Sequence, residues 1–254
     1  MRSLCDRLGA MREGLSVGNL GSTIPRASTT DRSMNTSPDN QPARRPLLPW
    51  LIAALVACVV PAGVLAMAGD PRITAPVFAV GLMGAGMISA AIAGRFRVGV
   101  FAALLNGAGL VLLALALGLP AFGDPLAAVL AAVIASVSFA ARGSLFALSA
   151  APRGWWVALA IVAGEAAVLL TAIAMPGAWP GWVLALLPAQ WATIAFQSAL
   201  TGTGTRLAAA ALIALAGTAA ATTLVTRLWP RRWPYLVMFT TWAGLSALVW
   251  DAMA

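Results

Sequence analysis

WWVALAIVAGEAAVLLTAIAM, residues 155–175, decides the kind of fold this chain adopts. Its only residues with polar side chains, apart from the two tryptophans, are Glu165 and Thr171. With a helical rise of about 1.5 Å per residue, about 20 residues cross the ~30 Å hydrocarbon core of a bilayer. Because hydrocarbon offers no partner to a bare backbone, this run predicts a membrane-spanning helix.

Seven other runs of similar length share this character, and only short linkers join them. The eight runs are 47–68, 72–93, 98–118, 125–147, 155–175, 181–200, 206–226 and 234–253. The sequence therefore predicts an all-α fold, a polytopic membrane helical bundle of about eight transmembrane helices arranged as four hairpins. A seven-helix alternative, in which one run fails to cross, remains open.

Prolines and arginines recur with the period of a helical hairpin. Each of four prolines opens an apolar run, and each of four arginines precedes another: Pro71, Pro125, Pro180 and Pro234, and Arg45, Arg97, Arg153 and Arg206. Proline suits the first turn of a helix, where its missing N–H costs no hydrogen bond. Two spans with two short turns have this length in any case, so internal duplication stays an open alternative.

Composition identifies lipid as the main surroundings of the chain. Of its 254 residues 61% are hydrophobic and 9% charged, whereas an average soluble domain is about 25% charged. The net charge of +8 comes from arginines in linkers and in the N-terminal segment. Since these do not gather on a folded polar surface, we expect no nucleic-acid partner.

Missing residue types exclude several classes of chemistry. All 16 basic residues are arginine, and the chain has no histidine. Without lysine there is no Schiff-base chemistry, and without histidine there is no imidazole for haem, zinc or general-base catalysis. Cys5 and Cys58 make neither a disulfide framework nor a metal cluster. We therefore expect no catalytic residue, cofactor or metal.

The first 46 residues differ from the rest. Serine, threonine, asparagine, proline and arginine dominate there, which predicts a disordered polar tail before a transmembrane domain over 47–254. Met34 begins a plausible short cytoplasmic lead, so residues 1–33 are open to being non-native.

Arginine also predicts orientation, because positive charge is retained on the cytoplasmic side of membrane helices. Eight spans with a cytoplasmic N-terminus in a bacterial inner (plasma) membrane place most arginines inside. Arg227, Arg231 and Arg232 are the exception and fall on the outer side. The tryptophans predict an inner and an outer aromatic belt: Trp50, Trp155, Trp156 and Trp250 inside, and Trp179, Trp182, Trp229 and Trp233 outside.

Glu165 is the sharpest candidate for function, because it lies near the middle of its predicted span. A carboxylate there is costly to ionise, and such groups serve as proton carriers or as hydrogen bonds between helices. Arg142 is the obvious partner. Counted along the helices, however, the two residues differ in depth by roughly 10 Å, which favours an Arg142 side chain extended to the nearer surface.

Uncharged polar residues predict a hydrophilic path or, alternatively, hydrogen bonds that hold helices together. The path candidates are Gln190, Thr193 and Gln197 on one face of the sixth run, Thr218 and Thr222 in the seventh, and Asn106 in the third. Gly86, Ala90 and Gly94 form a ridge of small residues typical of close helix packing. Pro61, Pro76 and Pro188 lie within spans and favour kinks.

These residues favour a small permease in which Glu165 titrates. The alternative is a non-catalytic subunit or assembly factor of a membrane complex, with Arg227, Arg231 and Arg232 as an outer contact patch for a membrane protein or a second copy of the chain. A lipid-modifying enzyme ranks third, because it would need a nucleophile or a base at the membrane surface, and the sequence offers only arginine, threonine and aspartate for these roles.

Overall fold

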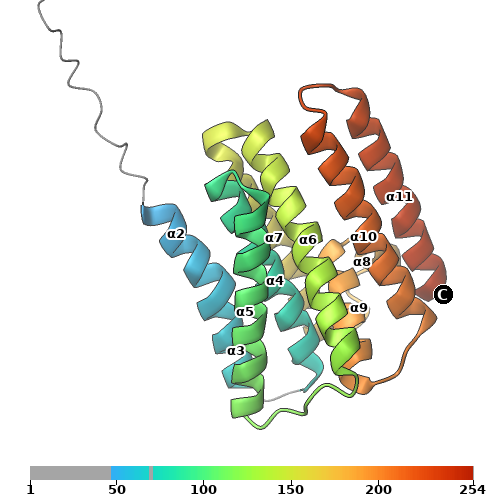
Figure 1. Cartoon of the computed structure of the whole chain (residues 1–254). Helices are drawn as coiled ribbons and strands as arrows, with labels where there is room; N and C mark the ends of the chain where they lie inside the picture. The colour runs from blue at the N-terminus through green and yellow to red at the C-terminus, as the bar shows by residue number, and fades with distance from the viewer. Residues whose placement is uncertain (1–46, 69–70, 254) are drawn as a thin grey trace, which may run out of the picture. The chain divides into compact units, whose positions relative to one another are not determined.

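The computed structural model describes residues 47–68 and 71–253, and every regular element in these ranges is a helix. The expected tail, residues 1–46, lies outside the described residues. The elements in Figure 1 are α2 (Leu47–Ala54), the π-helical turn η1 (Leu55–Val59), α3 (Val60–Ala68), α4 (Pro71–Ala93), α5 (Phe96–Ala116), α6 (Pro125–Ser149), the 3-10 turn η2 (Ala151–Arg153), α7 (Gly154–Ala174), α8 (Gly181–Ala185), α9 (Pro188–Thr201), α10 (Arg206–Arg227) and α11 (Trp233–Met253).

Seven helices within the described ranges are long and apolar enough to cross a membrane. They are the continuous helix formed by α2, η1 and α3, together with α4, α5, α6, α7, α10 and α11. The fold is thus all-α with seven candidate spans. The run expected to form an eighth, residues 181–200, is not among them.

Pro188 interrupts that eighth run. Proline has no N–H to donate, and its ring clashes with the carbonyl four residues earlier. It also drives the preceding residue out of the helical region, and Leu187 is extended, with φ −91° and ψ 118°. The run therefore becomes two helices, α8 of 5 residues and α9 of 14 residues that begins at Pro188. The prediction of one continuous helix over 181–200 is corrected accordingly.

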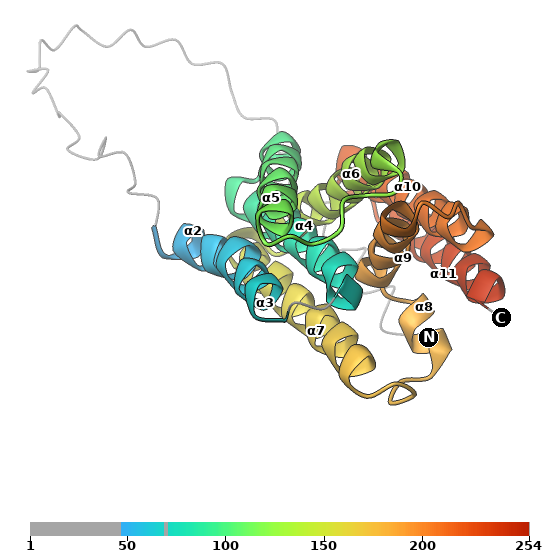
Figure 2. The same cartoon turned by 90° about the horizontal axis from the view of Figure 1, so that it is seen from below.

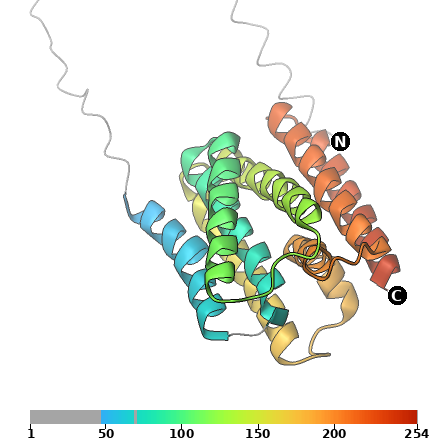
Figure 3. The ribbon, with the colours of Figure 1, turned by 60° about the horizontal axis from the view of Figure 1, so that its bottom comes forward.

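The interrupted segment begins and ends at the same end of the bundle. The backbone N–H of Gly123, in the loop between α5 and α6, donates to the Leu200 carbonyl at 3.2 Å, so α9 ends beside that loop. In Figure 3 α9, in orange, lies next to this green loop. The C-terminal half of α7 returns to the same end, because Leu169 shares a small cavity with Pro76 near the start of α4. Residues 175–205 therefore enter and leave the bundle at the same end and do not cross it.

We call the two ends of the bundle the lower face and the upper face, as they stand in Figure 1. The lower face carries the turns 117–124, 175–180 and 202–205, and the upper face carries the turns 94–95, 150–153 and 228–232. Because the helices alternate in direction, α2 starts at the upper face and α11 ends at the lower face.

Arginine is concentrated on the upper face. Of the arginines in the described ranges, the upper face carries Arg95, Arg97, Arg153, Arg227, Arg231 and Arg232, and the lower face carries Arg72 and Arg206. The three arginines between α10 and α11 thus share a face with those expected inside. Their expected place on the opposite side is corrected, and the reason is that residues 181–200 do not cross the bundle.

Tryptophans lie at both ends of the bundle, but three of them lie at the end opposite to the predicted one. Trp229 and Trp233 lie at the upper face with Trp50, Trp155 and Trp156, and Trp250 lies at the lower face with Trp179 and Trp182. The ring of Trp250 reaches Gly181, where an added Cβ would be 2.7 Å from it. The predicted membership of the two belts is therefore corrected by the same change in topology.

Helix α4 forms the centre of the bundle. Phe78, Leu82, Met83 and Met87 are among its fully buried side chains, and Figure 2 shows α4 surrounded by α5, α6, α7 and α9. Small residues allow this proximity, because a Cβ added at Gly143 of α6 would overlap the Met87 carbonyl oxygen. By contrast, large apolar side chains such as Phe101 and Leu112 of α5 stay exposed, as expected of a surface that faces lipid.

The predicted small-residue ridge on α4 is real over part of its length. A Cβ added at Gly99 of α5 would be 2.5 Å from the Gly86 carbonyl oxygen and 2.6 Å from the Ala90 Cβ. Gly94 has a different role, because its φ of +62° is the left-handed conformation that commonly ends a helix. Gly86 and Ala90 therefore pack helices together, whereas Gly94 terminates α4.

Candidate functional site

A cavity of about 460 Å³ lies between α6, α7, α10, α11 and the break between α8 and α9. Its lining is mostly apolar: Met87, Leu145, Phe146, Ile161, Val183, Leu186, Leu187, Pro188, Met238, Phe239 and Trp242. Four polar side chains complete it: Arg142, Glu165, Thr218 and Thr222. Arg142 and Glu165 are the charged residues of this lining, and their formal charges cancel when both are ionised.

Glu165 binds the start of the interrupted helix. Its side chain is 8% exposed and lies in the middle of α7. Its Oε2 accepts a hydrogen bond of 2.9 Å from the backbone N–H of Ala189, the second residue of α9. The first N–H groups of a helix have no partner within it and form the positive end of the helix dipole. Because Pro188 breaks the helix inside the bundle, this positive end meets Glu165 instead of water.

Arg142 reaches the cavity from α6. Its Nη2 donates to the hydroxyl oxygen of Thr218 at 3.4 Å, a long contact, and Arg142 lines the same cavity as Glu165. The expectation that Arg142 extends to the nearer surface is therefore corrected. The expected difference in depth was counted along helices taken as perpendicular to the membrane. Inside the bundle the guanidinium also has a hydroxyl partner, and it shares a cavity with a carboxylate. Since a guanidinium has five N–H donors, Arg142 retains donor capacity toward the cavity.

Thr218 and Thr222 place hydroxyl oxygens on the opposite wall. The Thr218 hydroxyl donates to the Ala214 carbonyl at 2.8 Å, and the Thr222 hydroxyl donates to the Thr218 carbonyl at 2.7 Å. Their protons are thus used within α10, and their oxygens remain able to accept hydrogen bonds. Ser138 of α6 lies 3.4 Å from the Thr218 hydroxyl oxygen, so a short polar network connects α6 to α10.

Asn106 is not part of this cavity lining. Its amide nitrogen donates to the carbonyls of Ala57 at 2.9 Å and Gly81 at 3.0 Å. Pro61 stands four residues after Ala57 and lacks the N–H that would bond this carbonyl in an α-helix. Asn106 therefore supplies the missing donor beside the π-helical turn η1 and joins three helices. This contact matches the helix-bridging alternative for Asn106.

The polar face expected on α9 does not line the cavity either. The Thr193 hydroxyl donates to the Ala189 carbonyl at 2.9 Å. Gln190 is half-buried and does not line the cavity. Gln197 is exposed and lines a separate cavity of about 170 Å³ at the lower face, together with Arg72 and Thr201. The structure thus unites Glu165, Arg142, Thr218 and Thr222 and separates Gln190, Thr193, Gln197 and Asn106 from them.

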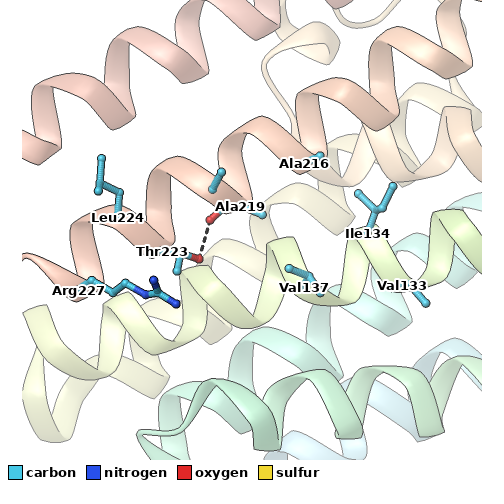
Figure 4. A pocket seen from close by; sticks show the side chains of 9 residues that line it. Val133, Ile134, Val137, Ala216, Ala219, Thr223, Leu224 and Arg227 are labelled. Atoms are coloured by element: carbon cyan, nitrogen blue, oxygen red, sulfur yellow. Dashed lines mark hydrogen bonds between the residues drawn. The ribbon is translucent and has the colours of Figure 1, made fainter.

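Arg227, Arg231 and Arg232, the expected contact patch, are all exposed at the upper face. Arg227 also lines one end of a groove between α6 and α10 (Figure 4). These three residues lie at the end of α10 and in the turn that follows it, whereas Thr218 lies in the middle part of α10. The patch and the cavity are therefore separate features.

Sequence reasoning missed the wall that α11 contributes, namely Met238, Phe239 and Trp242. Nothing in their pattern distinguishes them from side chains that face lipid. It also missed the backbone N–H of Ala189, although Pro188 was a usable signal for a helix start. Within the described ranges no group of three or more His, Cys, Asp or Glu side chains could hold a metal ion.

Comparisons with protein-family models, with curated proteins and with solved structures found no match to this chain.

Proposed function

We propose that the protein is a small permease, in which the cavity beside Glu165 binds the substrate and Glu165 carries the coupled proton. Its seven apolar helices indicate an integral membrane protein. The observation that carries the proposal is the hydrogen bond from Ala189 at the start of α9 to Glu165. Interrupted helices whose N-terminal ends face an ionic group near mid-membrane are a recurrent way in which transporters build substrate sites.

The geometry supports an anionic substrate. The guanidinium of Arg142 lines the cavity and attracts negative charge, and the Glu165 carboxylate lines the same cavity and accepts a hydrogen bond from the backbone N–H of Ala189. When Glu165 takes up a proton it loses its negative charge, and the guanidinium of Arg142 becomes available to a substrate anion. Proton and anion then occupy the site together and leave together. One proton therefore accompanies each negative charge, and transport is electroneutral.

The apolar lining supports a substrate with an apolar body. Phe146, Met238 and Trp242 face the cavity from two helices, and mostly apolar pockets with a few placed polar groups are typical of small-molecule sites. A cavity of about 460 Å³ accommodates a small organic acid. The substrate class we propose is therefore an amphipathic organic anion, with its acidic group at Arg142.

Proton flux in liposomes tests this proposal. The purified protein is reconstituted around a trapped pH-sensitive dye, and aryl and alkyl sulfonates are added outside, because these strong acids do not cross lipid in neutral form. We expect internal acidification with at least one sulfonate in the wild type. Glu165→Gln should abolish the proton flux, and Arg142→Gln should abolish it as well, because the substrate anion loses its cationic partner.

Thr240→Val is the matched control, because the Thr240 hydroxyl is exposed to the surroundings and bonds its own helix at Leu236. It should behave as wild type. Glu165→Gln keeps an oxygen that can accept from Ala189, so the bundle should remain folded and the loss should be specific to flux. Equal proton flux in wild type and Glu165→Gln, or no flux with any sulfonate, would contradict the proposal.

A subunit or assembly factor of a membrane complex is the second candidate, and the exposure of Arg231 and Arg232 favours it. Charge reversal at these two residues should then release a stoichiometric protein partner during native purification, while Glu165→Gln has no effect. Purification of the wild type without a partner would argue against this candidate.

The orientation we propose has the upper face in the cytoplasm of a bacterial cell, in the inner membrane. Six arginines on that face against two on the lower face, within the described ranges, support it through the retention of positive charge on the cytoplasmic side. Leu47 would then start inside and Met253 end outside. Alkaline phosphatase fused to the C-terminus should be active. A fluorescent C-terminal fusion of green fluorescent protein would contradict this orientation, because that protein does not fluoresce when exported unfolded.

A further inference from the structure

A groove of about 460 Å³ runs between α6 and α10 (Figure 4). Val133, Ile134 and Val137 line it from α6, and Ala216, Ala219, Ala220, Thr223, Leu224 and Arg227 line it from α10. The alanines hollow the surface of α10, and the Thr223 hydroxyl is turned to the Ala219 carbonyl at 2.8 Å. The walls of the groove are therefore apolar up to Arg227.

The groove has the length of one membrane leaflet. From Ala216 to Arg227 the helix rises by roughly 16 Å at about 1.5 Å per residue, which is about half of the ~30 Å hydrocarbon core. Ala216 lies near the middle of α10, and Arg227 is the last residue of α10, at the upper face. The α10 wall of the groove thus extends from mid-membrane to the level at which lipid headgroups lie, and the α6 wall is formed by Val133, Ile134 and Val137.

Charge distinguishes this groove from an ordinary lipid-facing surface. The guanidinium of Arg227 lies along the groove and is directed toward Thr223 (Figure 4). Arg231 and Arg232 follow within the next turn of the chain. Within the described ranges, the turns of the upper face carry no acidic residue that would compensate these charges. Arginine pairs well with phosphate oxygens, and basic sites beside membrane helices bind anionic headgroups.

We propose that this groove binds one anionic phospholipid of the upper-face leaflet. One acyl chain lies between α6 and α10, and the phosphate contacts Arg227. The occupant is a lipid because the groove is apolar over a leaflet's thickness, and the lipid is anionic because the guanidinium stands where its phosphate would lie. This site does not depend on the permease proposal, because it shares no lining residue with the cavity beside Glu165.

Native mass spectrometry with two matched lipids tests the site. The purified protein is exchanged into mixed micelles that contain phosphatidylglycerol and phosphatidylcholine with identical chains. We expect the wild type to retain one phosphatidylglycerol in preference to phosphatidylcholine. Arg227→Gln should lower this preference by about fivefold, the effect of one basic residue at a membrane surface. Arg206→Gln, at the lower face, is the matched control and should leave the preference unchanged.

A second variant tests the apolar part of the groove. Ala220 is exposed, so Ala220→Phe fills the groove without disturbing the core and should displace both lipids. Thermal unfolding confirms that each variant is folded. Equal retention of the two lipids by the wild type would overturn the proposal, as would an undiminished preference in Arg227→Gln or undiminished lipid binding in Ala220→Phe.

Discussion

Asn106 illustrates how a single residue acquires its role from a distant one. In the sequence it is a polar residue within an apolar run, and a hydrophilic path and a helix bridge explain it equally well. The structure pairs its amide with the carbonyl of Ala57, which Pro61 deprives of a helical donor. Asn106 therefore compensates for a proline on another helix. This relation could not be read from the sequence, because it depends on which helices are neighbours.

The pairing of Asn106 with Pro61 predicts a coupled effect on stability. Asn106→Leu removes two hydrogen bonds between helices and should lower the free energy of unfolding by about 1–2 kcal/mol, since such bonds in membranes average about 0.6 kcal/mol and reach about 1.7. In a Pro61→Ala background the new N–H can bond the Ala57 carbonyl, so the cost of Asn106→Leu should fall by about half.

Reversible unfolding in mixed micelles of the four proteins of this double-mutant cycle provides the measurement. Thr240→Val serves as the control for loss of a polar group on an exposed helix surface. An identical cost of Asn106→Leu in both backgrounds would refute the coupling.

At the scale of elements, seven of the eight runs predicted from hydropathy form helices long and apolar enough to cross a membrane, and residues 181–200 do not form such a helix. Hydropathy reports whether a segment tolerates lipid, and it does not report whether the segment crosses the membrane. The break at Pro188 is satisfied by the Glu165 carboxylate from α7, so a segment of spanning length can stop halfway. Pro188 was a visible signal for a kink, but the partner that stabilises the break came from another helix.

The contacts of α4 give a prediction for close helix packing. Gly143→Ala places a Cβ against the Met87 carbonyl oxygen and 2.9 Å from the Ala90 Cβ. Since backbone atoms cannot yield as a flexible side chain does, this overpacking should lower the free energy of unfolding by about 1–3 kcal/mol. Thermal unfolding in detergent measures it.

Gly164→Ala in α7 is the matched control, because an added Cβ there has no neighbour within 4 Å. Its removal of a helical glycine should leave the stability equal or slightly higher. Comparable destabilisation by the two variants would show that α4 and α6 are not packed as described.

For the whole molecule, the path of residues 181–200 determines the arginine pattern, the tryptophan belts and the candidate site together. With eight crossings, Arg227, Arg231 and Arg232 would lie on the side opposite to most other arginines. With seven crossings they lie on the same side as most of them. Of the candidate site, Glu165, Arg142, Thr218 and Thr222 could be proposed from the sequence because buried polar residues in membranes are few. Their assembly around the start of α9 could not be predicted, since α9 begins inside residues 181–200, which look like one continuous span in the sequence.

Cysteine labelling from the two sides of the membrane tests the path of α8 and α9 most directly. In a background without Cys5 and Cys58, single cysteines are introduced as Ala178→Cys before α8, Gly204→Cys after α9, and Arg231→Cys between α10 and α11. A membrane-impermeant thiol reagent should label Ala178→Cys and Gly204→Cys from the same side and Arg231→Cys from the other. Labelling of Ala178→Cys and Gly204→Cys from opposite sides would contradict the account.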